Sequence, residues 1–200
     1  MRDDGFVMAI VTVSSSEKGP EPAFPSLLLI NPKFSGNVIN AHRLGACFGV
    51  PQVWCTGDRV GHDLDRGRKT RIPPEERLRG FGKVDLIWCE RAFEILRASD
   101  ALVVGVEIAQ GARSLLEFEH HAPDHDGRIC YVFGPEDASL GDEVTAACDV
   151  LVQIPAHHCL NLAAAVAAVL WDRTSKLCRD RGVAAPTLSA EQRGWAETES

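Results

Sequence analysis

The chain has 200 residues, of which 45% are hydrophobic and 24% charged, and its formal net charge is −7 at pH 7. This length suits one globular domain with flexible ends, and no apolar run approaches the ~20 residues that a membrane span requires. The first residues, MRDDGFVMAIVTVSSS, lack the basic start and the small-residue exit of a secretory signal, so we expect a cytoplasmic protein.

The chain contains seven cysteines, which is an odd number, and none of them forms a C-x-x-C pair. Most lie in apolar runs. We therefore expect buried free thiols in a reducing compartment, rather than disulfides or a cysteine metal site.

The N-terminal part of the chain divides into a tail and a strand–helix–strand unit. Residues 1–24, with two prolines and a serine run, are expected to form a tail of uncertain structure, although residues 6–13 could form a strand. A strand at 26–30, a turn at 32–36, a helix at 37–48 and a strand at 53–56 follow. Strands joined by a helix through short loops predict a parallel sheet.

Residues 57–83 interrupt this pattern with a stretch rich in glycine, proline and charge. A loop this long in a compact domain is usually functional or mobile. It is the densest basic stretch in an otherwise acidic chain, which favours contact with phosphate groups over a solvated loop of mixed charge. The candidate phosphate-binding residues are Arg66, Arg68, Lys69 and Arg71.

The middle of the chain returns to regular structure. A strand at 84–88, a short helix at 91–96 and a strand at 101–106 are expected. The polar segment 117–127 contains three histidines, but its proline and glycine make it loop sequence without the fixed geometry that a metal site needs. No metal is expected.

The stretch 128–171 organises the rest of the chain. Apolar runs at 129–133 and 150–154 read as strands buried on both faces, each stopped by a proline-containing loop, and 160–170 reads as a largely buried helix. A short helix separates the two strands. Ligands in open α/β sheets bind beyond the carboxyl ends of such strands, so the loops 134–140 and 155–159 form the expected site.

Three motifs resemble those of the SpoU/TrmH branch of the SPOUT RNA methyltransferases. The family's second motif, F-G-x-E-x-x-G-L, corresponds to FGPEDASL at 133–140, and its third, I-P-x followed by S-L-N and an Ala-rich helix, corresponds to 154–155 and 159–162. Its first motif is matched by Asn31-Pro32, Gly36-Asn37, Arg43 and Phe48-Gly49. The motifs occur in the family's order.

The resemblance implies a trefoil-knotted α/β domain, spanning 25–182, with helices on both faces of a mostly parallel sheet and with 183–200 as a flexible tail. It implies S-adenosylmethionine as cofactor and methyl transfer to a ribose 2′-hydroxyl of RNA, by a homodimer. Since no long RNA-binding domain precedes the match, tRNA is favoured over rRNA as substrate. The net charge is unusual for an RNA-binding protein, which gives the basic segment 57–83 its importance.

The expected cofactor pocket is formed by residues at the ends of three strands and in the loop that follows the last. Backbone groups of these loops are suited to bind adenine and ribose, and a glycine at 134 allows a ligand to approach closely. The candidate cofactor-binding residues are Val106, Gly134, Ile154, Cys159 and Leu160.

The candidate catalytic residues are Arg43, Asn37, Glu136 and Asn161. A guanidinium is always protonated, so Arg43 is expected to clamp an RNA phosphate and stabilise developing alkoxide charge rather than act as a base. Glu136 is expected to accept hydrogen bonds from backbone N–H groups, and Asn161 also reads as a helix N-cap. The proton acceptor is left open.

The chain departs from the family pattern at Ser139, at Cys159 and in a shortened loop before Leu160. These departures leave two alternatives, a paralogue that binds RNA or cofactor without efficient catalysis and an unrelated nucleotide-binding or NAD-binding α/β protein. In the same loop His157 and His158 point apart, so they are not expected to chelate a metal together. One of them is a candidate for contact with RNA or the methionine part of the cofactor.

Overall fold

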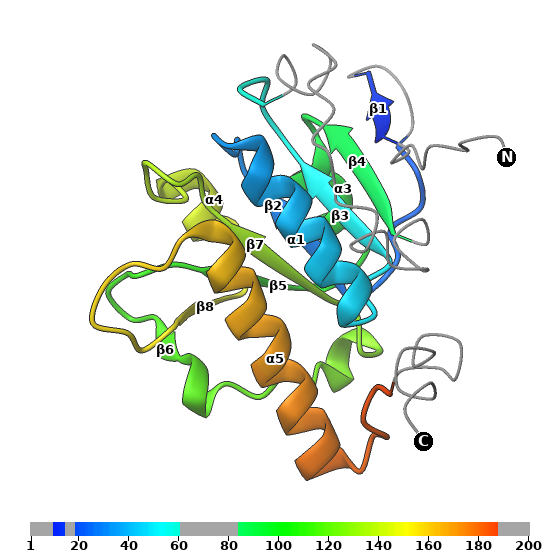
Figure 1. Cartoon of the computed structure of the whole chain (residues 1–200), viewed down its shortest axis with the longest axis vertical. Coiled ribbons are helices and arrows are strands. Elements are labelled where there is room, and N and C mark those ends of the chain that lie inside the picture. Colours follow the sequence, from blue (N-terminus) through cyan, green and yellow to red (C-terminus); the bar gives the residue numbers. More distant parts are fainter. Residues whose placement is uncertain (1–9, 15–18, 61–83, 188–200) are drawn as a thin grey trace, which may run out of the picture.

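The computed structural model describes residues 10–14, 19–60 and 84–187. These residues form a single eight-stranded sheet in the order β1-β4-β3-β2-β7-β5-β8-β6 (Figure 1). Every pair of neighbouring strands is parallel, from β1 beside β4 at one edge to β6 beside β8 at the other. The α/β class and the parallel sheet expected from the sequence are confirmed.

The strand expected at 129–133 occurs with both ends as predicted, and the other strands expected between residues 26 and 154 occur with ends shifted by at most one residue. The strands are β1 Ile10–Val13, β2 Ser26–Leu29, β3 Gln52–Cys55, β4 Asp85–Cys89, β5 Leu102–Val106, β6 Arg113–Ser114, β7 Ile129–Phe133 and β8 Val150–Gln153. The sequence did not indicate β6, because two residues are too few to carry a hydrophobic pattern. β1 lies within the segment expected to be a tail and adds an edge strand to the sheet.

The helices are α1 Ser35–Cys47, α3 Ala92–Ala98, α4 Asp142–Ala147 and α5 Leu162–Arg181, with 3-10 turns η3 Leu115–Glu117 and η4 Pro123–His125. The predicted end of the last helix at residue 170 was wrong by three turns. Its apolar run covers only the first half of α5. The second half is amphipathic and ends where Gly182 takes a left-handed conformation, with φ of +65°.

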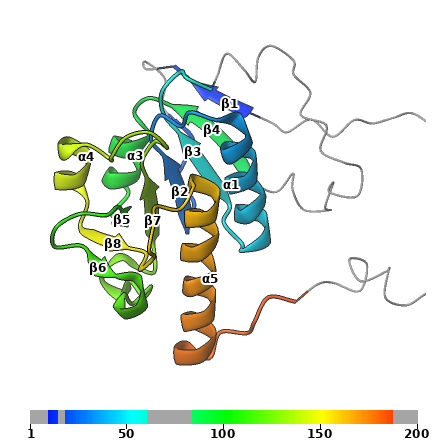
Figure 2. The same ribbon diagram turned by 60° about the vertical axis from the view of Figure 1, so that its left-hand side comes forward.

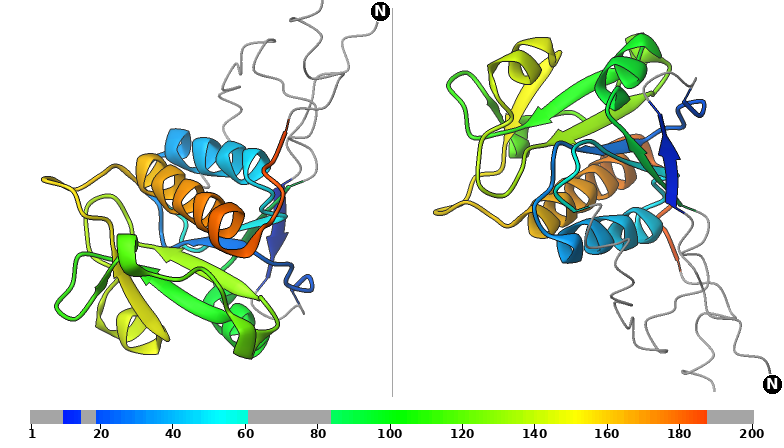
Figure 3. Two further views of the ribbon diagram at one scale, coloured as in Figure 1. Left: turned by 90° about the horizontal axis from the view of Figure 1, so that it is seen from below. Right: turned by 90° about the horizontal axis from the view of Figure 1, so that it is seen from above.

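Two helix layers cover the sheet. α1 and α5 lie side by side on one face, and α3 and α4 lie on the other (Figures 2 and 3). Along β7, Ile129, Tyr131 and Phe133 pack under α1 and α5, whereas Cys130 and Val132 pack under the opposite layer. Successive side chains of a strand point to opposite faces of the sheet, and a central parallel strand has no solvent face. The whole strand is therefore apolar.

A buried polar cluster anchors the second half of α5. The cluster comprises His120, Tyr131, Asp172 and Lys176. The imidazole of His120 lies 2.7 Å from the Tyr131 hydroxyl and 2.8 Å from the Asp172 carboxylate. Lys176 Nζ pairs with Asp172 at 2.8 Å and also donates to the carbonyl of Phe118 at 3.0 Å. Burial lowers the pKa of His120 to about 4, so its neutral ring accepts from the tyrosine and donates to the aspartate.

The trefoil knot stays a prediction. No helix in the part of the chain that the structure describes combines the length and hydrophobicity needed to cross a bilayer.

The order of the central strands brings the carboxyl ends of β5, β7 and β8 to one edge, where the two loops singled out from the sequence meet.

Candidate functional site

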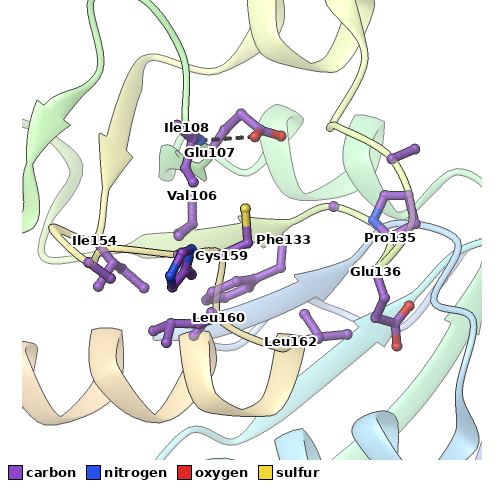
Figure 4. Close-up of a pocket in the computed structure, with 15 residues that line it drawn as sticks. Val106, Glu107, Ile108, Phe133, Pro135, Glu136, Ile154, Cys159, Leu160 and Leu162 are labelled. Atoms are coloured by element: carbon purple, nitrogen blue, oxygen red, sulfur yellow. Dashed lines mark hydrogen bonds between the residues drawn. The ribbon is translucent and has the colours of Figure 1, made fainter.

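A cavity of about 190 Å³ lies beyond the carboxyl ends of β5, β7 and β8, against the first turn of α5 (Figure 4). Each predicted cofactor-binding residue lines it. The lining residues are Val106, Glu107, Ile108, Phe133, Gly134, Pro135, Glu136, Ala138, Ile154, Ala156, His158, Cys159, Leu160, Leu162 and Ala165.

The walls of the cavity are mainly apolar, with a few polar groups among them. Figure 4 shows Phe133 at the end of β7, Val106 at the end of β5 and Leu162 at the start of α5 surrounding it. Leu160 is 44% exposed, which is unusual for a large aliphatic side chain and leaves apolar surface available to a ligand. Such a cavity, apolar with few polar groups, is typical of small-molecule and cofactor sites.

Gly134 packs closely against its own loop. A Cβ at this position would lie 3.1 Å from the Leu140 amide nitrogen and 3.4 Å from the carbonyl carbon of Ser139. These tight contacts disfavour a side chain here, and the close approach of a ligand to Gly134 stays a prediction. Ser139 has a negative φ, and the positive φ that this loop needs falls on Gly141, at +81°. A serine at 139 thus causes no backbone strain.

Glu107 was missed by the sequence reasoning. It directly follows β5, and its two carboxylate oxygens accept from the amides of Ile108 at 2.9 Å and of Leu140 at 2.8 Å. The side chain thereby ties the end of β5 to the loop after β7. Its place one residue beyond a buried strand was the signal that could have identified it.

Glu136 joins the loop after β7 to the start of α1, as the sequence suggested. Its carboxylate accepts from the amides of Lys33 at 2.6 Å and Phe34 at 3.3 Å, and from the side-chain amide of Asn37 at 2.8 Å. Burial alone would raise the pKa of Glu136, but these hydrogen bonds outweigh it and lower the pKa below its ordinary value. Glu136 therefore ties the loop after β7 to the residues that lead into α1 and to the side chain of Asn37 in its first turn.

A cluster of exposed charges extends this connection. Asp137 pairs with Lys33 at 3.0 Å and with Arg59 through two bonds of 2.9 and 2.8 Å. The hydrogen bond from the Arg59 guanidinium is the main reason why the pKa of Asp137 lies well below its usual range. Arg59 lies at the beginning of the basic segment, so the first part of that segment is fixed beside the cavity.

The predicted catalytic residues do not all lie at the cavity. Asn37 donates its amide to Glu136, and Asn161 caps α5 by accepting from the amide of Ala164 at 2.7 Å. Arg43 is half-buried in the middle of α1, away from the cavity of its own chain. Next to it, His42 bonds the carbonyl of Val84 at 2.8 Å, so α1 is fixed both at its start and at its centre.

The loop before α5 carries three further polar side chains. His158 and Cys159 line the cavity, whereas the adjacent His157 does not. Cys159 and Cys47 are exposed, which corrects the expectation of buried thiols at those positions, and all seven cysteines are free. Arg66, Arg68, Lys69 and Arg71 lie outside the described residues, within which no group of three or more metal-ligating side chains occurs.

Comparison with known proteins gives one family. A model of the SpoU rRNA Methylase family matches residues 25–171. Over 174 residues the chain is 28% identical to the tRNA (cytidine-2'-O-)-methyltransferase TrmJ of Methanocaldococcus jannaschii, which covers 78% of this chain and 70% of that protein.

Solved structures share the fold. The A. aeolicus TrmH/SpoU tRNA modifying enzyme superimposes with a TM-score of 0.62 and 15% identity, covering 88% of this chain and 87% of that one. The SpoU methyltransferase AviRb from Streptomyces viridochromogenes, in complex with the cofactor AdoMet, gives a TM-score of 0.59 and 18% identity. The match covers 80% of this chain but only 61% of AviRb, so the chain spans less than two thirds of that relative.

Proposed function

The chain belongs to the SpoU rRNA methylase family, and from this membership we propose that it transfers a methyl group from S-adenosylmethionine to a ribose 2′-hydroxyl of RNA. The observation that carries the proposal is the cavity at the ends of β5, β7 and β8. It gathers the loops of two family motifs, 134–140 and 155–159, around one space.

The cavity fits the cofactor in its chemistry. Val106, Phe133 and Ile154 offer apolar surface for an adenine ring, and Glu107 and Glu136 place negative charge beside it, which suits a sulfonium cation. When bound, S-adenosylmethionine supplies an activated methyl group. Val106, Gly134, Ile154, Cys159 and Leu160 are proposed to hold it.

The protein's contribution is to hold the acceptor in line with the donor and to stabilise charge. Orientation alone supplies up to ~7–11 kcal/mol in favourable systems. Arg43 is proposed to clamp an RNA phosphate and to stabilise the developing alkoxide. The bonds from Glu136 and His42 fix the helix that carries it. Asn37 and Asn161 act by holding α1 and α5, and Glu136 acts as an acceptor rather than as a base.

We further propose that the substrate is a tRNA and that the enzyme works in the cytoplasm as a homodimer, with a knotted domain over 25–182 and flanking segments at 1–24 and 183–200. A dimer would bring Arg43 of one subunit to the cavity of its partner, which accounts for its distance from the cavity of its own chain. Light scattering at micromolar concentration should give twice the mass of one chain. A monomer would contradict the dimer.

The function is tested by incubating purified protein with labelled S-adenosylmethionine and total RNA, and by mapping 2′-O-methyl sites in RNA from a deletion strain and its parent. We expect label in RNA and the loss of at least one site in the deletion strain. Cofactor binding without transfer to any RNA would instead identify an inactive paralogue. Binding of NAD but not of S-adenosylmethionine would place the protein outside RNA methylation.

A further inference from the structure

The proposed reaction releases a proton that none of the residues assigned so far can take. The acceptor hydroxyl loses its hydrogen as the new bond to carbon forms, and the guanidinium of Arg43 is already protonated. A side chain beside the cavity with an available lone pair can take this proton directly. Among the described residues that line it, the titratable side chains are Glu107, Glu136, His158 and Cys159.

The two carboxylates are already occupied. Glu136 accepts three hydrogen bonds from α1 and the residues before it, and Glu107 accepts two backbone N–H bonds. Protonating either would break the bonds that close the cavity. The lowered pKa of Glu136 also makes it a weaker base than an ordinary glutamate.

Cys159 is a poor candidate for a different reason. A thiolate is a strong nucleophile, so a cysteine that gave up its proton here would compete with the RNA for the methyl group.

His158 has the properties that the other groups lack. It is exposed, lines the cavity, and makes no hydrogen bond to any described residue. An imidazole is the side chain that most often serves as a general base, since its neutral ring carries a nitrogen that accepts a proton. His158 directly precedes Cys159, which lines the same cavity.

Building on the proposed function, we infer that His158 is the general base of the methyl transfer. A ring nitrogen of the neutral imidazole takes the proton of the ribose 2′-hydroxyl while the oxygen forms its bond to the methyl carbon. The carbon–sulfur bond breaks, and its electron pair stays on the sulfur. The products are the 2′-O-methyl ribose, S-adenosylhomocysteine and an imidazolium, which returns its proton to solvent.

This role predicts a pH dependence of the chemical step. The rate should rise with pH as the imidazole loses its proton and then level off. The other titratable side chains that line the cavity with His158 are Glu107, Glu136 and Cys159.

His157 supplies a matched control, because it is the same residue type, one position away and outside the cavity lining. Single-turnover methylation should fall ~10²- to 10⁴-fold in His158→Gln and lose its rise with pH, whereas His157→Gln should keep both rate and profile. Added imidazole should restore part of the rate to His158→Gly. Equal rates in the two glutamine variants, or an unchanged pH profile in His158→Gln, would overturn the assignment.

A second measurement does not depend on turnover. Imidazole NMR signals of the full chain, assigned through the two glutamine variants, should move for His158 and stay in place for His157 when S-adenosylhomocysteine is added. An unmoved His158 signal with ligand bound would remove it from the site. If the parent protein bound the ligand but methylated no RNA, the proposed function itself would fail, and the assignment of His158 with it.

Discussion

Glu136 connects parts of the chain that lie 99 residues apart in sequence, through its bond to Asn37. Without it, the amides of Lys33 and Phe34, directly before α1, would lose their carboxylate acceptor. These bonds give the motif residue Glu136 a structural role. Its carboxylate fixes the helix of Arg43 relative to the loop of the cavity.

Replacing Glu136 with glutamine should lower the free energy of unfolding by about 1–3 kcal/mol at neutral pH, because an amide cannot accept every bond that the carboxylate accepts. The pKa of Glu136 is lowered in the folded state, so its contribution is present above the unfolded value of ~4.3 and disappears as the pH falls through the folded value. Urea unfolding should show that the variant and wild type differ less in free energy of unfolding in acid than at pH 7. Glu94 forms an exposed ion pair with Arg91, so Glu94→Gln serves as the control. This substitution should change the free energy of unfolding by less than ~1 kcal/mol.

Arg43→Lys should lower single-turnover methylation about 100- to 1000-fold, equivalent to losing ~2.7–4 kcal/mol of transition-state stabilisation. Lysine keeps the charge but loses the planar fork that contacts phosphate and alkoxide together. Cofactor affinity measured by calorimetry should stay near that of wild type. A variant with weaker RNA binding and normal turnover would show that Arg43 only binds.

At the scale of elements, α5 is held at both ends by polar groups as well as by its apolar face. Asn161 caps its start, and the buried cluster around Asp172 and Lys176 holds its second half against β7 and η3. Because the first turn of α5 forms one wall of the cavity, this anchoring also sets the shape of the candidate site.

The cluster predicts acid sensitivity. The pKa of His120 falls from 6.5 to about 4 on folding, so the unfolded chain binds the proton more readily and stability is lost as the pH drops from 6.5 towards 4. The full shift corresponds to about 3 kcal/mol. His120→Gln should be less stable at pH 7 but should show a flatter dependence on pH in urea unfolding. The exposed control His157→Gln should keep the wild-type dependence of unfolding free energy on pH. If the free energy of His120→Gln changed with pH in parallel with wild type, His120 would not be the source of the acid sensitivity.

The sequence predicted these elements where one physical signal dominated. Apolar runs located the central strands, since both faces of a parallel sheet are buried, and the motif loops located the cavity. The end of α5 was misplaced because its polar half depends on partners such as His120, which bonds Asp172 from a distant part of the sequence. The tight packing of Gly134 and the role of Glu107 could not be predicted either, since each depends on how the loop reaches Leu140.

At the scale of the whole molecule, the chain has a net negative charge, and its proposed substrate, RNA, is a polyanion. Binding of RNA therefore depends on where the positive side chains lie on the surface. Arg59 is held beside the cavity by Asp137, so the basic segment that follows starts next to the candidate site.

Neutralising Arg66, Arg68, Lys69 and Arg71 together should weaken RNA binding while leaving turnover at saturating RNA nearly unchanged. Each lost phosphate contact should reduce the slope of log affinity against log salt by ~0.7–0.9. Single-turnover methylation across RNA concentration at two salt levels measures both effects. Arg179 and Arg181, at the far end of α5, offer a control substitution. Lost turnover with intact affinity would mean that the segment takes part in chemistry.

The strand order has a consequence for how the protein is made. β7 lies between β2 and β5, both of which leave the ribosome before it, and Ser26 of β2 pairs with Cys130. A nascent chain that ends before β7 therefore exposes two apolar strands with no central partner, a condition that favours aggregation and chaperone binding. The cavity needs the start of α5 as well. The capacity to bind a ligand thus arises only once the start of α5 has been synthesised, and a ribosome stalled before residue 162 holds a chain without a complete cavity.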